Sequence, residues 1–201
     1  MNKSPVTQRD NLFSMLYFSR HLEPFEPVIF FGTLLGFVRQ GMPIDGDDDV
    51  DFYIDRRHFV GVRDKLRSMG FDVRGRYPNI SDWFIQVSGC VEGHEVRVDF
   101  YFYESDSERQ ILLERWNFKG QVDDSLQAMR VPSPLFFPLR RVRIFDGAIY
   151  VPSYPELICE FLYGPNWREP KKKNSDYDIK VVAGRPVRFA FNHLNQFVLL
   201  D

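Results

Sequence analysis

The stretch DGDDDVDFYID, from Asp45 to Asp55, joins an acidic run to an alternating apolar pattern. Side chains alternate between the two faces of a β-strand, so a strand over 49–54 separates its acidic residues from its apolar residues. Asp49 and Asp51 then share one face, while Val50, Phe52 and Ile54 share the other. We therefore expect the apolar face to pack on a core and the acidic face to stay open.

A second stretch, HEVRVDFYFYE from His94 to Glu104, has the same design and carries Asp99 on its polar face. If the two strands are neighbours on a shared core, Asp99 lies beside Asp49 and Asp51. Three carboxylates on one face raise each other's pKa values, and a bound divalent cation removes this repulsion. We therefore predict a site for Mg²⁺, or Mn²⁺, at these three residues, because such ions prefer oxygen ligands that substrate phosphates complete.

The acidic run has two simpler interpretations. A lone acidic run is usually a solvated turn without a ligand, but two separate Asp-bearing strands are harder to explain in that way. An EF-hand calcium loop fits poorly, because Val50 stands where that loop needs Gly and Arg56 stands where it needs a bidentate Glu.

The segment FFGTLLGFVRQG, from Phe30 to Gly41, precedes the acidic run. An apolar run predicts a short buried strand, then a turn at Gly32 and Thr33, then a short helix over 34–39. Backbone N–H groups at a helix N-terminus favour a phosphate, so Gly32 and Thr33 are candidate phosphate-binding residues. Arg39 either clamps a phosphate or pairs with the acidic loop.

The remaining pattern predicts one mixed α+β (α/β) domain over 1–201, with a C-terminal helical and basic extension from about residue 152. Ser153 and Glu156 have the spacing of a capping box at the start of the last helix, and Gly164 ends it. The basic run from Lys171 to Lys173 is expected to be solvated. Further helices are predicted over 7–21 and 56–69, and further strands near 71–73, 83–87 and 95–103.

Composition excludes several classes of protein. The 201 residues are 44% hydrophobic with a formal net charge of -2, which gives no overall bias toward nucleic acid or an anionic membrane. No stretch approaches the roughly 20 apolar residues of a membrane span, and no signal peptide is visible. Cys90 and Cys159 lack zinc-site spacing, so free thiols in a reducing compartment are expected. We expect a cytoplasmic protein with no nucleic-acid partner, whose membrane contact is at most peripheral.

Three motifs together resemble the LicD family of the nucleotidyltransferase superfamily, which includes the fukutin and fukutin-related proteins. They are GTLLGFVR at 32–39, DDDVD at 47–51 and VDFYF at 98–102, and the late segment VPSYPELICEFLYGPNW at 151–167 supports them. Gly46 replaces the Trp that this family has before its acidic run, and the loop is one residue longer. The resemblance implies a nucleotidyltransferase-like fold, a central mixed β-sheet flanked by helices.

The resemblance also implies a metal-dependent phosphotransferase that moves a phosphocholine or phosphopolyol group from a CDP-activated donor to a glycan hydroxyl, releasing CMP. By this resemblance Asp49 and Asp51 bind the metal, and Asp99 is the third ligand or the general base. Asp47 matches an acidic family position and assists a second metal or the acceptor. The donor phosphates are held by Gly32 and Thr33, with Arg39 nearby.

Two other functions remain open from the residues. A true nucleotidyltransferase, which adds NMP from an NTP to a small-molecule acceptor, shares the same acidic triad. A non-catalytic binding module with a degraded site is the second alternative, and the intact Asp49, Asp51 and Asp99 argue against it.

Overall fold

The two Asp-bearing strands are direct neighbours. β2 (Val50–Asp55) and β4 (His94–Asp106) pair in parallel, and their register runs from Val50 opposite Val98 to Asp55 opposite Tyr103. The computed structural model describes residues 6–73, 82–114, 116–117, 121–122, 129–171, 188–191 and 197–200. The pairing of these two strands organises the rest of the fold.

Within those described ranges, β2 and β4 lie inside an eight-stranded mixed sheet of order β8-β5-β4-β2-β1-β10-β9, in which β3 pairs with β4. The β1–β10 pair is parallel like β2–β4, and the other pairs are antiparallel. The expected central mixed sheet is thus present. Its other strands are β1 (Val28–Ile29), β3 (Phe84–Val91), β5 (Ile111–Glu114), β8 (Met129–Pro132), β9 (Arg140–Ile144) and β10 (Gly147–Val151).

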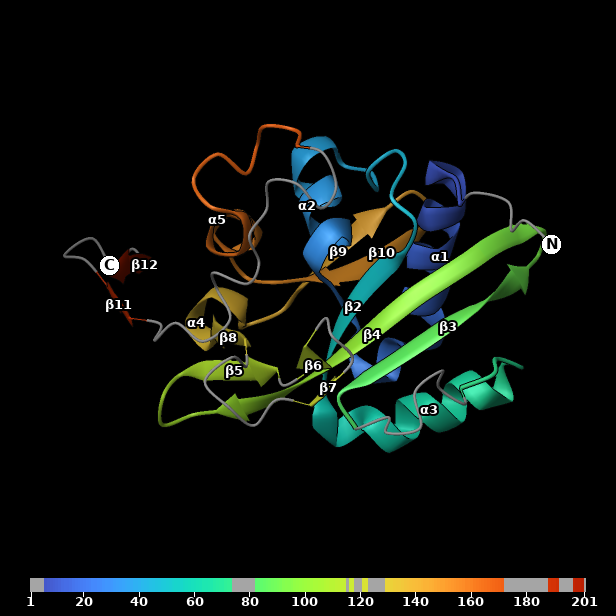
Figure 1. Cartoon of the computed structure of the whole chain (residues 1–201), viewed down its shortest axis with the longest axis horizontal. Coiled ribbons are helices and arrows are strands. Elements are labelled where there is room, and N and C mark those ends of the chain that lie inside the picture. Colours follow the sequence, from blue (N-terminus) through green and yellow to red (C-terminus); the bar gives the residue numbers. More distant parts are fainter. Residues whose placement is uncertain are drawn as a thin grey trace.

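Helices pack on both faces of this sheet (Figure 1). The face that carries Phe100 and Phe102 meets α1 and α3, since Phe18 lies edge-on to Phe100 at 5.6 Å and Phe59 edge-on to Phe102 at 5.0 Å. The opposite face meets α2 and α4, and α5 packs against both of these helices. The helices are α1 (Gln8–His21), α2 (Phe31–Gln40), α3 (Phe59–Ser68), α4 (Ser133–Phe136) and α5 (Pro155–Tyr163).

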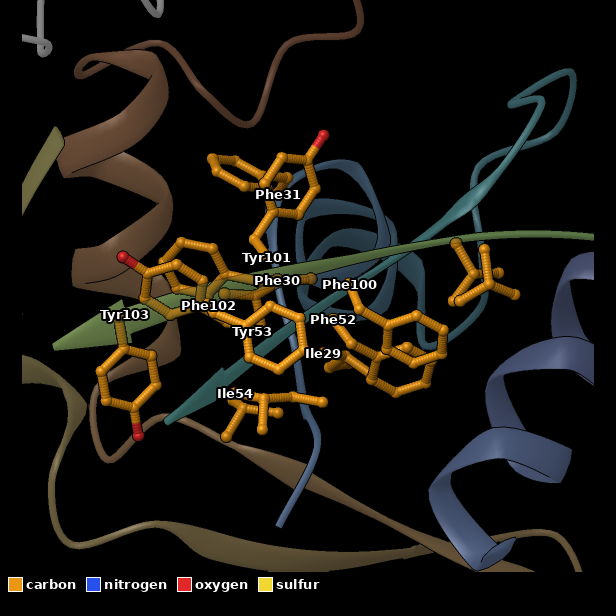
Figure 2. Close-up of a cluster of buried hydrophobic side chains, with 14 of the residues drawn as sticks. Ile29, Phe30, Phe31, Phe52, Tyr53, Ile54, Phe100, Tyr101, Phe102 and Tyr103 are labelled. Atoms are coloured by element: carbon orange, nitrogen blue, oxygen red, sulfur yellow. The ribbon is translucent and has the colours of Figure 1, made fainter. Parts of the chain in front are cut away.

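The face of β2 and β4 that carries Asp51, Asp99 and the tyrosines is more buried than the alternating sequence pattern predicts. Tyr53 is fully buried and stacks on Phe30 at 4.3 Å, and Phe136 of α4 lies edge-on to it. Figure 2 shows Tyr101 with Phe31 on the side of the strands opposite Phe52 and Phe100. The expectation of an open acidic face is therefore wrong, because α2 and α4 cover that face with aromatic rings.

Most predicted boundaries lie close to the observed ones. Thr7 caps α1 and forms a capping box with Asp10, and the side chain of Asp55 accepts a hydrogen bond from the Arg57 N–H. The helix predicted over 56–69 begins as a 3₁₀ turn, Arg56–His58, before α3. Residues 71–73 form no strand, so that prediction is wrong.

The predicted capping box of the last helix is also wrong. α5 begins at Pro155 with Tyr154 as its N-cap, and no side chain of the described residues caps it. Glu156 instead pairs with Arg168 at 2.8 Å. Because Ser153 stands two residues before the first helical residue, its hydroxyl lies outside the position from which an N-cap reaches the first turn.

Short antiparallel pairs complete the described chain. β6 (Trp116–Asn117) pairs with β7 (Gln121–Val122), and β11 (Arg188–Phe191) pairs with β12 (Phe197–Leu200). Lys172 and Lys173 of the predicted basic run lie outside the described residues. Over the described residues, no helix has both the length and the apolar character that crossing a membrane requires.

Candidate active site

The parallel register of β2 and β4 brings the predicted carboxylates together. Asp51 stands opposite Asp99, and Asp49 precedes the first residue of β2. One carboxylate oxygen from each of these three residues lies within 4.8 Å of the others. Asp47 and Asp48 form a second such group with Asp49. The predicted convergence is thus observed, and an all-oxygen donor set of this size fits Mg²⁺ or Mn²⁺.

Burial makes this cluster electrostatically unfavourable without a cation. The pKa of Asp51 is raised well above its ordinary value, first by burial and then by the charges of Asp49, Asp99 and Asp47. A hydrogen bond from the backbone N–H of Gly32 acts in the opposite direction. A divalent cation between the carboxylates would compensate the same repulsion, so the residues present fit such an ion.

The start of α2 packs directly on the carboxylates. The N–H of Gly32 donates to Oδ2 of Asp51 at 3.1 Å, which places a helix N-terminus against a negative charge. A Cβ atom on Gly32 would lie 2.8 Å from Oδ2 of Asp47 and 3.5 Å from Oδ2 of Asp51. Glycine at this position therefore lets two carboxylates approach the helix backbone.

The first turn of α2 also holds β2 in place. The Asp51 N–H donates to Oγ1 of the buried Thr33 at 2.8 Å, and the Phe30 N–H donates to the Asp51 carbonyl at 3.0 Å. Gly32 and Thr33 lie inside the helix rather than in the predicted turn before it, since α2 already begins at Phe31. Their contact with donor phosphates stays a prediction.

Arg39 lies away from the carboxylate cluster. It stands in the last turn of α2, seven residues after Gly32, which corresponds to about 10 Å along the helix axis. Among the described residues, no ion pair joins Arg39 to the acidic loop; Asp48 of that loop pairs instead with Arg97 at 3.2 Å. The role of Arg39 as a phosphate clamp stays a prediction.

Gln86 is a site residue that the sequence reasoning missed. It stands opposite Asp99 in the β3–β4 pairing, and its Nε2 donates to Oδ1 of Asp99 at 2.8 Å. This hydrogen bond restrains the Asp99 carboxylate on the β3 side, while Asp51 flanks it on the β2 side. The alternating pattern of β3 places Gln86 on a polar face, but only the strand register shows which residue it meets.

Aromatic side chains follow the carboxylates along the same strands, and Figure 2 shows one of them, Tyr101, together with Phe31 of α2. Phe31 lies edge-on to Tyr101 at 4.8 Å, and both side chains are buried. The pKa of the Tyr101 phenol is raised well above its ordinary value by burial, and next by the charges of Asp51 and Asp99. Aromatic rings beside the carboxylates exclude water, which strengthens every charge interaction in the cluster.

Comparison with known proteins gives a family match. A model of the family described as LicD/FKTN/FKRP, nucleotidyltransferase domain, matches residues 27–153, a span that holds all four acidic candidates and Gln86. One similar solved structure is that of the lincosamide antibiotic adenylyltransferase LnuA with lincomycin bound. It is 15% identical, covers 75% of this chain and 82% of its own, and has a TM-score of 0.48. No curated protein sequence gives a significant match.

Proposed function

The chain belongs to the LicD/FKTN/FKRP nucleotidyltransferase-domain family, and from this premise we propose that it is a phosphotransferase acting on a glycan. Family membership points to an enzyme that transfers phosphorus-containing groups. Our proposal is narrower: a phosphocholine or phosphopolyol group passes from a CDP-activated donor to a glycan hydroxyl. The observation that supports it most strongly is the convergence of Asp49, Asp51 and Asp99 from two neighbouring strands.

Asp49, Asp51 and Asp99 would hold Mg²⁺ or Mn²⁺. When bound, the cation would neutralise charge on the donor phosphates, which is the main requirement of phosphoryl transfer. The chain contributes the positions of the ligands: Asp51 and Asp99 are set by the sheet register, and the Gly32 N–H orients the Asp51 carboxylate.

The proposed transfer is a direct displacement at phosphorus. The acceptor hydroxyl oxygen forms a bond to the phosphorus that carries the choline or polyol, and the bond from that phosphorus to the CMP oxygen breaks. CMP leaves with the electron pair, and the hydroxyl proton passes to a carboxylate. Asp99 would serve either as the third metal ligand or as this base, and Gln86 restrains its carboxylate through Oδ1 in either role. Asp47, whose carboxylate lies close to Gly32, would assist a second metal or the acceptor.

Nucleotidyl transfer is the alternative function, because the matched family is described as a nucleotidyltransferase domain. In that reaction an acceptor oxygen attacks the α-phosphorus of an NTP and pyrophosphate leaves. The same three carboxylates would serve both reactions. The two reactions are therefore distinguished by their leaving group, CMP in the first and pyrophosphate in the second.

One assay distinguishes these activities. The protein is incubated with Mg²⁺, glycan acceptors and, in separate reactions, CDP-choline, CDP-ribitol, CDP-glycerol or NTPs. CMP release with labelling of the acceptor supports the proposed function, whereas pyrophosphate release supports the alternative. Absence of both products, together with absence of metal and nucleotide binding, would identify a binding module without catalysis. Asp49→Ala is the inactive control, and Asp45→Ala is its match, since Asp45 is an exposed residue of the same loop.

A further inference from the structure

The acidic loop over 41–49 is held by amide side chains from two helices. The Pro43 carbonyl accepts from Nε2 of Gln8 in α1 at 2.7 Å and from Nε2 of Gln40 in α2 at 3.0 Å. Four residues later, the Asp47 carbonyl accepts from Nδ2 of Asn11 in α1 at 2.9 Å. Two side chains of α1, Gln8 and Asn11, thus hydrogen-bond to the loop backbone at Pro43 and Asp47.

Asp49 depends on this loop more than the other two carboxylates do. Asp51 and Asp99 lie within paired strands, whereas Asp49 precedes β2 and is outside the ladder, whose first pair is Val50 with Val98. Asp49 stands two residues after Asp47, whose carbonyl accepts from Asn11, and this step spans about 7 Å at most. The Asn11 hydrogen bond therefore limits where the Asp49 carboxylate can stand.

α1 itself is anchored independently of the loop. Met15 and Phe18 are fully buried, and Phe18 packs edge-on against Phe100 of β4. Asp10 contacts Nδ1 of His94 at 2.9 Å. A helix fixed in this way provides a rigid support from which Asn11 reaches the loop, and loss of the Asn11 amide does not detach the helix.

Asn11 is fully buried, so its hydrogen bond to Asp47 is shielded from water. Its Oδ1 has no hydrogen-bond partner within the described residues, which leaves the donor side as the productive half of the amide. An apolar residue of similar size would remove that unsatisfied acceptor together with the donor. The free energy of unfolding should then change little, while the loop loses the hydrogen bond that holds its backbone.

We propose that Asn11 is a positioning residue for the metal-binding carboxylates, acting through the Asp47 carbonyl on Asp49. The inference rests on the proposed function, since it requires that the cluster bind a cation. α1 precedes the residues that match the family model, 27–153, so this support comes from a part of the chain outside the matched domain.

The test measures Mn²⁺ binding to the full chain by electron paramagnetic resonance, with thermal unfolding in parallel. Asn11→Leu should raise the Mn²⁺ dissociation constant by about 10-fold or more, the range typical of residues that orient metal ligands. Ser14→Ala is the matched control, because Ser14 is also fully buried on α1 and its hydroxyl has no partner among the described residues. The control should bind Mn²⁺ within about twofold of the parent, a shift of under 0.5 kcal/mol.

A second variant, Asn11→Ser, keeps a small polar group that is too short to reach the Asp47 carbonyl, and it should weaken Mn²⁺ binding similarly. Once activity is established, raising the Mg²⁺ concentration should restore turnover in both Asn11 variants, which a general folding defect would not allow. Parent-like Mn²⁺ affinity in Asn11→Leu would overturn this inference alone. Failure of both variants to fold would also overturn it, and a parent that binds no Mn²⁺ would overturn the metal site itself.

Discussion

Asp51 and Asp99 are register partners on adjacent parallel strands, and each residue is only 7% exposed. Neighbouring strands lie about 4.8 Å apart, so two same-face carboxylates at paired positions have little room to separate and little water to screen them. The sheet therefore builds an unfavourable charge arrangement into its own core. This arrangement favours the binding of a divalent cation between the carboxylates.

Removing one charge should stabilise the protein when no metal is present. Asp51→Asn keeps an oxygen that can accept the Gly32 N–H but cannot ionise, so in EDTA at pH 7 its melting temperature should exceed that of the parent. The expected rise is a few degrees, since 1 kcal/mol corresponds to roughly 2–4 °C in a protein of this size. Mg²⁺ should then raise the melting temperature of the parent more than that of Asp51→Asn.

The same comparison has a defined pH dependence. The folded-state pKa of Asp51 is raised by burial and by its neighbouring carboxylates, whereas its unfolded value is about 3.9. The contribution of this group to stability is fully present below about pH 3.9 and is lost as the pH rises through the raised folded pKa. The advantage of Asp51→Asn should disappear in acid. An Asp51→Asn protein less stable than the metal-free parent at pH 7 would contradict this electrostatic account.

Loss of Asp49 should remove activity without removing the fold. Asp49→Ala should lower kcat/KM by about 10³-fold, because charge stabilisation by a bound metal is worth several kcal/mol. Circular dichroism should be unchanged, since Asp49 lies outside the β2 ladder. Asp45→Ala, on the same loop, should retain activity close to that of the parent. Parent-like turnover in Asp49→Ala would refute the assignment of this cluster.

A methyl group at position 32 should disturb the acidic loop. In Gly32→Ala the new Cβ would stand 2.8 Å from Oδ2 of Asp47, so the Asp47 carboxylate has to move. We expect weaker Mn²⁺ binding with little loss of stability, because the contacted atom is the end of a side chain that can turn away and alanine is the better helix former. Gly89→Ala on β3 is the control, because among the described residues its Cβ would first meet a ring carbon of Phe71, at 3.9 Å. Equal effects in both variants would argue against a specific contact at Gly32.

Gln86 should influence turnover more than stability. Gln86→Leu removes the hydrogen bond to Oδ1 of Asp99, and kcat should fall by about 10-fold while the exposed side chain makes little difference to the melting temperature. Ser88→Ala, two residues along the same exposed face of β3, tests whether the effect is local. If Gln86→Leu and Ser88→Ala keep the same kcat as the parent, Gln86 does not position Asp99.

The buried hydroxyl of Thr33 should matter through the backbone of β2. Thr33→Val matches its shape but leaves the Asp51 N–H without its acceptor, which costs about 1–3 kcal/mol for a buried donor. Thr33→Ser keeps the acceptor and should lose less. Chemical denaturation of the two variants measures the difference. A Thr33→Val protein as stable as Thr33→Ser would show that another group satisfies this N–H.

Local pattern was sufficient for the parts of the site that depend on single strands. The alternating pattern placed Asp51 and Asp99 on the polar face of their own strands. This prediction needs no knowledge of the neighbours, because side chains in any strand alternate with a period of two. The predicted helix starts near residues 7 and 56 also lie close to the observed ones, where Thr7 and Asp55 make local capping hydrogen bonds. The resemblance of the three motifs to the LicD family added the expectation that the two strands belong to one sheet.

Packing decided the rest, because it joins residues that are distant along the chain. No local rule says that α2 and α4 cover the tyrosine face of β2 and β4, and the predicted open face was wrong for that reason. The pairing of Gln86 with Asp99 needs the β3–β4 register, and the contact of Asn11 with Asp47 needs α1 folded against the loop. The sequence by itself determined which carboxylates could share a strand face. Only the tertiary structure decided how closely they stand and which amides hold them there, since these contacts form only after the strands and helices have packed.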